Sequence, residues 1–434
     1  MAIGTSVAHR PGRASEPPAP AADIILKPPR FGVAIFNNPA SPTSGVACVE
    51  GERPKSFEAR TELPSDVIWI SDAYSAARAQ NMRGSDYLRT TPRQIGDDLG
   101  VDVRDPVDGL PVVAECIARV RDMAAHAYPW VNMAVDWSEA TLGRAIAKVT
   151  RMSGDPLAEA VQGALKQAYQ TYSTVPDVLR PDFANAGGGR MVTLRTNRLR
   201  YAHYLCGQLY PTGVWRSLHR KVIFESPVEA FLDPDRPVLV EATVEFLDRS
   251  ANAVPSALVA YGSNGSSRPI IRNWISQPEL AWLLGHANVH IQSALVCERS
   301  EPLPERLQLP RILTADPLYA LSVAAGVLAE NHWTGVASEQ YVRKAMPGAT
   351  AQPVAEVSSN AVWMRAYDRA YCFQMALEAH RRGYTVVSYG YGSVTVWARK
   401  EAYVDLMELA AQLGACHPDL GAMQDRDAVS MEST

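Results

Sequence analysis

The sequence predicts a mainly α-helical protein of the α+β type, with a helical body and a smaller β-containing region. Most of the chain consists of long segments in which apolar residues recur every three or four positions behind helix-start residues. One stretch, 221–275, instead mixes β-prone runs with Pro, Asn, Gly and Ser. At 434 residues and 47% hydrophobic content, the chain is long and apolar enough to bury a large core.

Composition divides the chain into four parts. Residues 1–30 are rich in Pro and Ala and have no apolar cluster before Ile24, so we predict a flexible arm. A helical first part follows over 31–220, then a β-rich insertion over 221–275 that we expect to project from the body. A helical second part covers 276–434.

The first part opens with strands and continues with helices. Asp72 and Ser138 are predicted N-caps, and Pro111 is predicted near the first position of its helix. The predicted strands are 31–38, 46–50 and 66–70, and the predicted helices are 72–88, 111–127, 138–152 and 155–172. In the second part we predict helices over 277–297, 315–333, 360–383 and 400–414, with a β-ribbon over 384–398.

The net charge and the spacing of the cysteines exclude several classes of protein. A net charge of −4 gives no general basic field for gripping a phosphate backbone. The six cysteines are far apart and form no CxxC pair, which is typical of free thiols in a reducing compartment. We find no signal peptide and no membrane-spanning run.

The triplet Gly96-Asp97-Asp98 is a candidate metal site. RNA-copying polymerases place such a triplet in a hairpin, where carboxylates converge to hold two divalent cations. Here the triplet lies in "PRQIGDDLG", between "TTPRQI" and a stretch rich in turn residues, which is poor strand context. We predict a loop between helices at 92–100 and keep, as an alternative, a metal-dependent nucleotidyl or phosphoryl transfer enzyme that uses Asp97 and Asp98.

Other patterns favour structural roles. His286 and His290 have the spacing of zinc ligands on a helix, but no third ligand is evident. Glu241 and Glu245 fit the outer face of a half-buried strand. The glycine-rich stretches 184–192 and 388–394 match no nucleotide fingerprint and predict a loop and a ribbon.

Arginines and aromatic residues are interleaved over 197–220. Such a stretch can stack bases and pair phosphates, so an RNA-binding factor is a further alternative, although the helical spacing favours a core or interface helix. No complete catalytic constellation is present. We therefore predict that the chain is not an enzyme, with no catalytic, cofactor-binding or metal-binding residue and no cofactor.

The overall plan resembles the coat proteins of gammapartitiviruses, small fungal double-stranded RNA viruses. The resemblance lies in the Pro/Ala arm that leads into "FGVAIFNNPASPTSGV", the helical body with a β-rich middle, and the helix-turn "LYALSVAAGVLAENHWTG". It implies a helical shell domain with a protruding arch. Dimers of the chain would close an icosahedral shell around the genome and its polymerase, in the virion and the host cytoplasm.

Three function classes follow: a capsid protein, the Asp97/Asp98 enzyme and an RNA-binding factor. The capsid protein is the one we predict. Its partners would be further copies of the chain, with weak contacts from the arm to enclosed double-stranded RNA or polymerase and no membrane.

Overall fold

The computed structural model describes most of the chain between residues 30 and 416. The described residues are 30–38, 42–72, 82–83, 87–105, 107–128, 142–143, 146, 159–169, 189–247, 270–315, 322–338, 340–346 and 349–416. The predicted N-terminal arm, the helix predicted over 138–152 and the polar C-terminal end lie wholly or mostly outside these residues.

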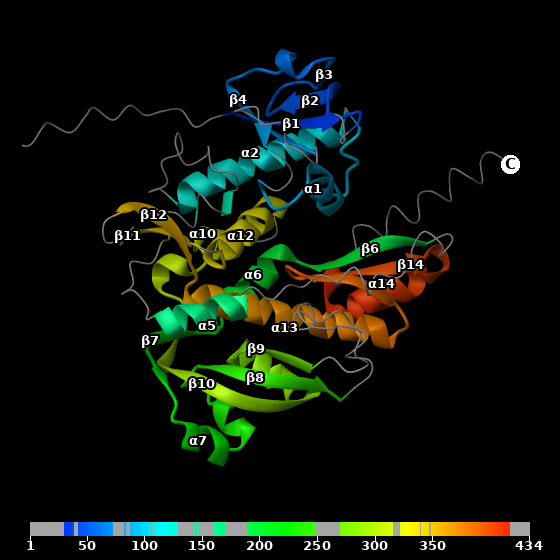
Figure 1. The fold of residues 1–434 in the computed structure, drawn as a ribbon. Helices are drawn as coiled ribbons and strands as arrows, with labels where there is room; N and C mark the ends of the chain where they lie inside the picture. Colours follow the sequence, from blue (N-terminus) through cyan, green and yellow to red (C-terminus); the bar gives the residue numbers. More distant parts are fainter. Residues whose placement is uncertain are drawn as a thin grey trace, which may run out of the picture.

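A five-stranded sheet forms one end of the molecule (Figure 1). Its order is β3-β2-β1-β4-β5, and β1 pairs antiparallel with β2 but parallel with β4. The strands are β1 (Arg30–Phe36), β2 (Gly45–Val49), β3 (Lys55–Phe57), β4 (Val67–Ser71) and β5 (Met82–Arg83). Helix α2 (Gly109–Ala127) packs along β1 and β2, and the short helix α1 (Pro92–Leu99) packs against α2.

A four-stranded antiparallel sheet lies at the opposite end (Figure 1). Its order is β7-β10-β8-β9, so the long strand β10 pairs with a neighbour on each side. The strands are β7 (Leu209–Ser217), β8 (Val238–Phe246), β9 (Ile270–Ser276) and β10 (Ala287–Pro302). Two short helices, α7 (Arg220–Glu225) and α9 (Gln277–Leu283), contact this sheet.

Buried helices lie between the two sheets. Every residue of α12 (Val323–Val336) from Ala324 onward is buried, so this helix has no solvent face. Helix α13 (Ser359–Arg381) contacts α12, α6 (Arg198–Cys206) and α5 (Glu159–Tyr169). Because α12 also contacts α6 and α2, it helps to join the part of the molecule around the first sheet to the rest of the core.

A third sheet has the order β13-β14-β6-β15 and flanks these helices. Its central pair joins segments about half the chain apart, because β6 (Gly189–Thr196) pairs with β14 (Ser393–Arg399). The other elements are β11 (Gln340–Met346), β12 (Ala349–Glu356), β13 (Thr385–Gly390), β15 (Ala415–Cys416), α10 (Ile312–Ala315) and α14 (Tyr403–Leu413), with 3-10 turns at Arg60–Glu62, Val228–Leu232, Glu305–Leu307 and Lys400–Ala402.

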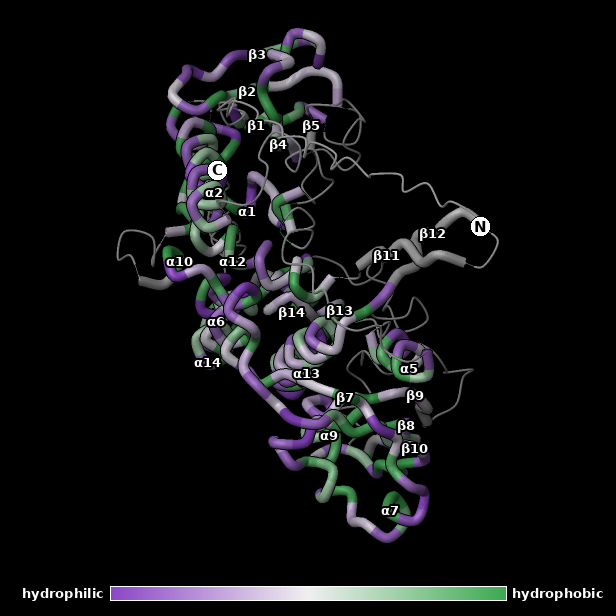
Figure 2. The backbone as a smooth tube through the Cα atoms, turned by 90° about the vertical axis from the view of Figure 1, so that its left-hand side faces the viewer, coloured by the Kyte–Doolittle hydropathy of each residue, from purple (hydrophilic) through white to green (hydrophobic). Residues whose placement is uncertain are grey.

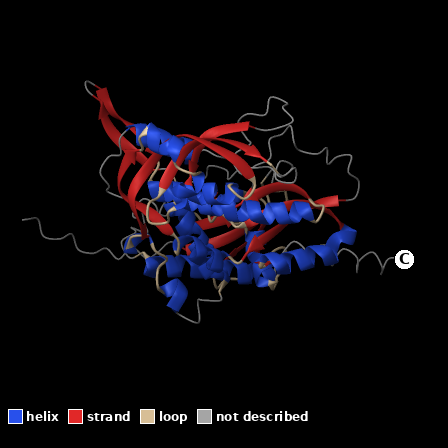
Figure 3. Cartoon of the chain, turned by 90° about the horizontal axis from the view of Figure 1, so that it is seen from below, coloured by secondary structure: helices blue, strands red, loops and turns tan. Residues whose placement is uncertain are grey.

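The predicted fold class is wrong. The described residues build sheets of five, four, four and two strands, and strands run through most of the body alongside the helices (Figure 3). The molecule is therefore a mixed α and β protein and not a mainly helical shell domain. The error arose because several strands, among them β7, β10, β11 and β12, lie in segments where no strand was predicted.

The segment predicted as one helix over 277–297 is the clearest case. Helix α9 ends at Leu283, and β10 begins at Ala287. Buried and exposed residues alternate at the start of β10, with Ala287 and Val289 inside and Asn288 and His290 outside. That period of two is what a half-buried strand requires, and the short run of apolar residues fitted a helix equally well.

Two further predictions near the first sheet are wrong. Of the helix predicted over 72–88, residues 73–81 and 84–86 lie outside the described ones, and the described part contains strand β5 and a turn. The predicted capping role of Asp72 concerns residues outside the described ones; its side chain accepts a hydrogen bond from the amide of Phe36. The loop predicted at 92–100 is helix α1. Thr91 and Gln94 form a capping box at its start, a signal that the turn-rich surroundings obscured.

The other long elements are confirmed. Strands β1, β2 and β4, helices α2, α5, α12, α13 and α14, and the ribbon β13–β14 all fall within predicted ranges or within about two residues of them. The predicted apolar stripe of α2 is buried against the sheet, and in Figure 2 this helix carries alternating hydrophobic and hydrophilic bands. The five cysteines whose side chains are described are free and buried, as predicted.

Candidate functional site

The turn between β13 and β14 has an unusual backbone. Tyr391 and Gly392 both have positive φ, 53° and 68°, which is the conformation of a two-residue type I′ hairpin turn. Gly392 is required here, because a Cβ would lie 2.7 Å from both Thr196 Oγ1 and the ring of Tyr201. Tyr391 is not a residue that favours this region of φ, so other contacts must hold it.

Asp368, on α13, holds the turn. This carboxylate is 2% exposed and accepts hydrogen bonds from the amides of Tyr391 and Gly392, both at 3.1 Å. It also accepts one from the hydroxyl of Tyr201 at 2.7 Å. Burial, together with the negative charge of Asp368, raises the pKa of Tyr201 well above its ordinary value, so the hydroxyl keeps its proton and remains a donor.

Arg365 lies one helical turn before Asp368, between two aromatic rings. Its guanidinium carbon is 4.7 Å from the ring centre of Tyr391 and 5.7 Å from that of Tyr169. Burial lowers the pKa of Arg365, but the neighbouring Tyr391, Tyr169 and Asp368 outweigh it and raise the pKa overall, so the group stays charged. The tyrosine rings position this cation without neutralising it.

Two more arginines, on other segments, lie near the turn that carries Tyr391. Arg89 precedes α1, and its guanidinium carbon is 5.8 Å from the ring centre of Tyr391. Its φ is 50°, and its Nε is buried without a hydrogen-bond partner among the described residues. Arg195, on β6, pairs in register with Ser393, two positions after Tyr391. Both arginines are half-buried.

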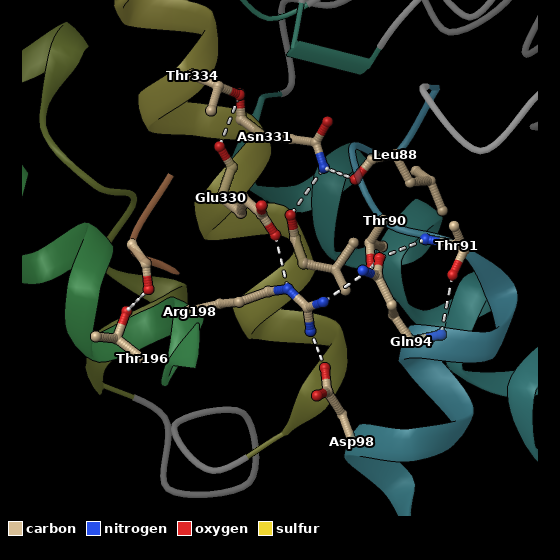
Figure 4. A network of polar contacts seen from close by, with 12 residues as sticks. Leu88, Thr90, Thr91, Gln94, Asp98, Thr196, Arg198, Glu330, Asn331 and Thr334 are labelled. Atoms are coloured by element: carbon tan, nitrogen blue, oxygen red, sulfur yellow. Dashed lines mark hydrogen bonds and ion pairs between the residues drawn. The ribbon is translucent and has the colours of Figure 1, made fainter. Parts of the chain in front are cut away.

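A neighbouring arginine is bound differently. Arg198, on α6, is 8% exposed and forms ion pairs with Glu330 of α12, at 2.6 Å, and with Asp98 of α1 (Figure 4). Its third contact is a 2.8 Å hydrogen bond donated to the hydroxyl of Thr90. Asn331, beside Glu330, donates to the carbonyl of Leu88 at 2.8 Å. These contacts join the first sheet's helices to the central core.

Glu330 interacts both with Arg198 and with the arginines near Tyr391. Burial raises the pKa of this carboxyl to about 7, although the positive charges of Arg195 and Arg89 act to lower it. Four arginines therefore share this region with three carboxylates, namely Arg89, Arg195, Arg198 and Arg365 with Asp98, Glu330 and Asp368. Among these seven side chains the positive charges outnumber the negative ones by one, and protonation of Glu330 adds to the excess.

We name Arg89, Arg195, Arg365 and Tyr391 the arginine–tyrosine cluster. Tyr391 is 38% exposed, so solvent reaches the cluster at this ring. Guanidinium groups present several donors in a planar fork that matches a phosphate or carboxylate. The chemistry that the arrangement supports is the binding of an anion beside an aromatic surface.

The predicted alternative metal site is not formed as proposed. Asp97 and Asp98 lie on helix α1 and not on a hairpin, and Asp98 is paired with the buried Arg198. Within the described ranges, no three His, Cys, Asp or Glu side chains come together in a way that could hold a metal ion. His286 stacks on Trp282 after α9, whereas His290 lies on β10, so the two do not share a helix.

The remaining sequence candidates are structural. Glu241 and Glu245 lie on β8 with Ala242 and Val244 buried on the other face, as predicted, and Glu241 accepts a hydrogen bond from Ser293. The glycine-rich stretch at 388–394 forms the predicted ribbon. Of the stretch 184–192, only the part from Gly189 is described, and it begins β6.

The aromatic and arginine residues of 197–220 are divided between the core and the surface. Arg198 is buried in ion pairs, and Tyr201, Tyr210 and Trp215 pack in the core. Arg200, Tyr204, Arg216 and Arg220 are exposed. The favoured interpretation of this stretch as a core element is confirmed for α6. Arg89, Arg365 and Tyr391 were not predicted from the sequence, because they come from distant segments. The one local signal was a tyrosine in a Y-G-Y-G turn where Asn is preferred.

Comparison with known proteins assigns no family. No protein-family model and no curated protein sequence matches the chain. Solved structures of phi29 DNA polymerase are similar at a low level. The complex with primer-template DNA is 12% identical, with a TM-score of 0.44, and the complex with single-stranded DNA is 11% identical, also with 0.44; each match covers 85% of this chain and 80% of the other.

The prediction that the chain is not an enzyme is not upheld, since the solved structures that are similar to it are DNA polymerases, and it is not proposed again. With TM-scores below 0.5, this similarity assigns neither a fold nor a reaction to the chain. Across the part of the chain that the structure describes, no helix is both long and apolar enough to cross a lipid bilayer.

Proposed function

We propose that this protein binds nucleic acid and holds the phosphodiester backbone at the arginine–tyrosine cluster. The observation that carries the proposal is the placing of Arg89 and Arg365 over one tyrosine ring. Arg365 remains charged there, in a region where arginines outnumber carboxylates. Phosphate oxygens accept from guanidinium donors, and nucleobases stack on tyrosine, so a nucleic-acid strand supplies both partners.

The negative net charge of the chain affects how strongly nucleic-acid binding should depend on salt. At −4 overall, the protein has no general attraction for a polyanion. Binding should therefore depend on the few arginines of the cluster, and its salt dependence should be modest. For single strands the logarithm of the affinity falls by about 0.7 per neutralised phosphate for each tenfold increase in salt, so three arginines give a slope near −2.

Fluorescence anisotropy with labelled single-stranded RNA and DNA tests the proposal. We expect binding in the micromolar range that weakens as NaCl is added. The double variant Arg89→Gln/Arg195→Gln should lose at least about tenfold in affinity and show a shallower salt slope. Arg216→Gln is the matched control, because Arg216 is exposed on β7 and lies outside the cluster. Equal binding by the double variant and the wild type would refute the proposal.

Self-assembly is kept as a second candidate, in the form of the predicted capsid protein. Three large apolar side chains on β7 and α7 favour it, since Val214 is 59% exposed, Val222 46% and Phe224 68%. Both elements contact β10, and exposed apolar side chains of this kind occur at protein interfaces. Contacts with double-stranded RNA or a polymerase, and a place in a virion, remain predictions.

Sedimentation velocity and negative-stain microscopy test self-assembly. We expect large particles of uniform size, and Phe224→Glu should reduce their amount if the surface at β7 and α7 takes part. A protein that remains a single subunit at high concentration contradicts this candidate and leaves the nucleic-acid proposal in place.

A further inference from the structure

Tyr391 occupies a turn position that suits other residues better. A type I′ turn needs positive φ at both central positions, where Asn-Gly is the preferred pair. Tyrosine at the first position is strained, because residues with a side chain rarely adopt a positive φ. The ring partly offsets this strain by packing at 5.8 Å from Trp333, which is 1% exposed, yet Tyr391 itself stays 38% exposed. Packing alone does not account for a ring left open to solvent.

The turn is fixed before any ligand arrives. Asp368 accepts from both central amides, and Tyr201 donates to the same carboxylate from below the turn. Thr196 also donates to the carbonyl of Gly392 at 2.9 Å, which ties the turn to β6. A ring held by this many contacts loses little freedom on binding, and such preorganisation increases affinity.

From this geometry we infer that the site takes single-stranded nucleic acid, with one unpaired base against Tyr391 and the adjoining phosphates on Arg89, Arg195 and Arg365. The inference rests on the proposed function and adds the class of strand. An unpaired base has an open face for stacking. In a duplex each base is covered by its neighbours and paired on its edge, so it reaches the ring only after unstacking.

The cations support this arrangement. Arg365 and Arg89 lie over the ring, from α13 and from the segment before α1, and Arg195 lies on the adjoining strand β6, opposite Ser393. Two cations at the ring and a third on the adjoining strand can contact the phosphates on either side of a stacked base. No pattern of donors and acceptors that would read a base edge is required, so we expect little sequence preference.

The test compares strands and variants by anisotropy, and uses a fluorescent adenine analogue that is quenched when it stacks. Wild-type protein should bind a single strand at least about tenfold more tightly than a blunt duplex of the same length, and should quench the analogue. Tyr391→Leu should lose about tenfold in affinity for the single strand and abolish the quenching, with an unchanged salt slope. Tyr391→Phe should retain both properties. Thermal unfolding of each variant shows whether it is folded.

The outcomes separate this inference from the proposed function. If the wild type shows salt-dependent binding that needs Arg89 and Arg195, but the duplex binds equally well or Tyr391→Leu binds and quenches like the wild type, the inference is wrong and the proposed function stands. If neither strand binds, both are wrong.

Discussion

Arg198 and Arg365 lie in the same central region, but different groups hold them. Arg198 meets two carboxylates and a hydroxyl from three separate segments, and it is almost completely buried. Arg365 lies between the rings of Tyr169 and Tyr391. Carboxylates neutralise a guanidinium and use its donors, whereas aromatic rings fix its position and leave its charge in place.

Burial and charge therefore do not by themselves distinguish an arginine that binds a ligand from a structural one. The distinction depends on whether the guanidinium is held by carboxylates or by aromatic rings. Arg198 has the surroundings of a structural cross-link between α1, α6 and α12, and Arg365 has those of a group that awaits an anion. The predictions below test this division, beginning with the largest effect.

The largest effect should come from Arg198→Met. The variant leaves Asp98 and Glu330 without their shared cation in a buried place, so the free energy of unfolding should fall by about 3–5 kcal/mol. Urea denaturation measures the change. Arg119→Met is the control, because this arginine pairs with Glu115 on the exposed face of α2 and should change stability by less than about 1 kcal/mol. Similar losses in both variants would remove the distinction.

The next effect is a loss of stability in acid that depends on His332. This side chain is fully buried, with Nδ1 2.6 Å from the hydroxyl of Tyr128 and Nε2 2.9 Å from the carbonyl of Leu307. A neutral ring satisfies both contacts, accepting from Tyr128 and donating to Leu307. Burial lowers the pKa of His332 to about 4, although the bond to Leu307 acts in the opposite direction.

The lowered pKa of His332 determines the direction in which stability changes with pH. The unfolded chain binds a proton near pH 6.5 and the folded chain only near pH 4, so the stability contribution is complete above pH 6.5 and is lost as the pH falls toward 4. The loss should be about 3 kcal/mol. Denaturation at a series of pH values measures it, and His332→Gln should flatten the curve over this window. An unchanged slope in the variant would show that other groups cause the acid sensitivity.

Arg365→Gln should separate binding from stability. We expect the affinity for single-stranded nucleic acid to fall about tenfold, since one cation of the arginine–tyrosine cluster is lost, while unfolding shifts by less than in Arg198→Met. Anisotropy and urea denaturation on the same preparation measure both. The opposite ranking, with Arg365→Gln the less stable variant and binding intact, would mean that the two arginines have exchanged roles.

The smallest effect should come from the start of α1, the helix that carries Asp98 to Arg198. The hydroxyl of Thr91 accepts a hydrogen bond from the amide of Gln94 at 3.0 Å. Thr91→Ala removes this cap and should cost about 1 kcal/mol, whereas Thr91→Ser keeps it and should cost much less. Thermal unfolding compares the two, and equal losses would argue against capping as the cause.

The helices and strands that were predicted correctly are those whose pattern of residues is continuous within one segment of the sequence. Helix α2 shows a continuous apolar stripe, α13 runs for 23 residues without a breaker, and the ribbon β13–β14 alternates around a glycine-containing turn. Strand β10 was missed because its partners, β7 and β8, are supplied by other segments. Sheet pairing over such separations leaves no mark on a short window of sequence.

The arginine–tyrosine cluster could not be predicted either, because its residues also come from distant segments. Arg89, Arg195, Arg365 and Tyr391 span 302 positions of the chain, and each looks ordinary in its own segment. Asp98 drew attention because it stands in a recognisable triplet, yet its partner, Arg198, is 100 positions away and turns it into part of a structural ion pair. Only the fold shows which charges neutralise each other.

The pairing of β6 with β14 has a consequence for synthesis on the ribosome. All strands of the first sheet have been made once residue 83 has left the ribosome, so this sheet can form early. The partner of β6, strand β14, is made roughly 200 residues later, which at about 5–20 residues per second leaves β6 without it for some 10–40 seconds. We expect the nascent chain to depend on chaperones during this interval, and slower translation to increase aggregation.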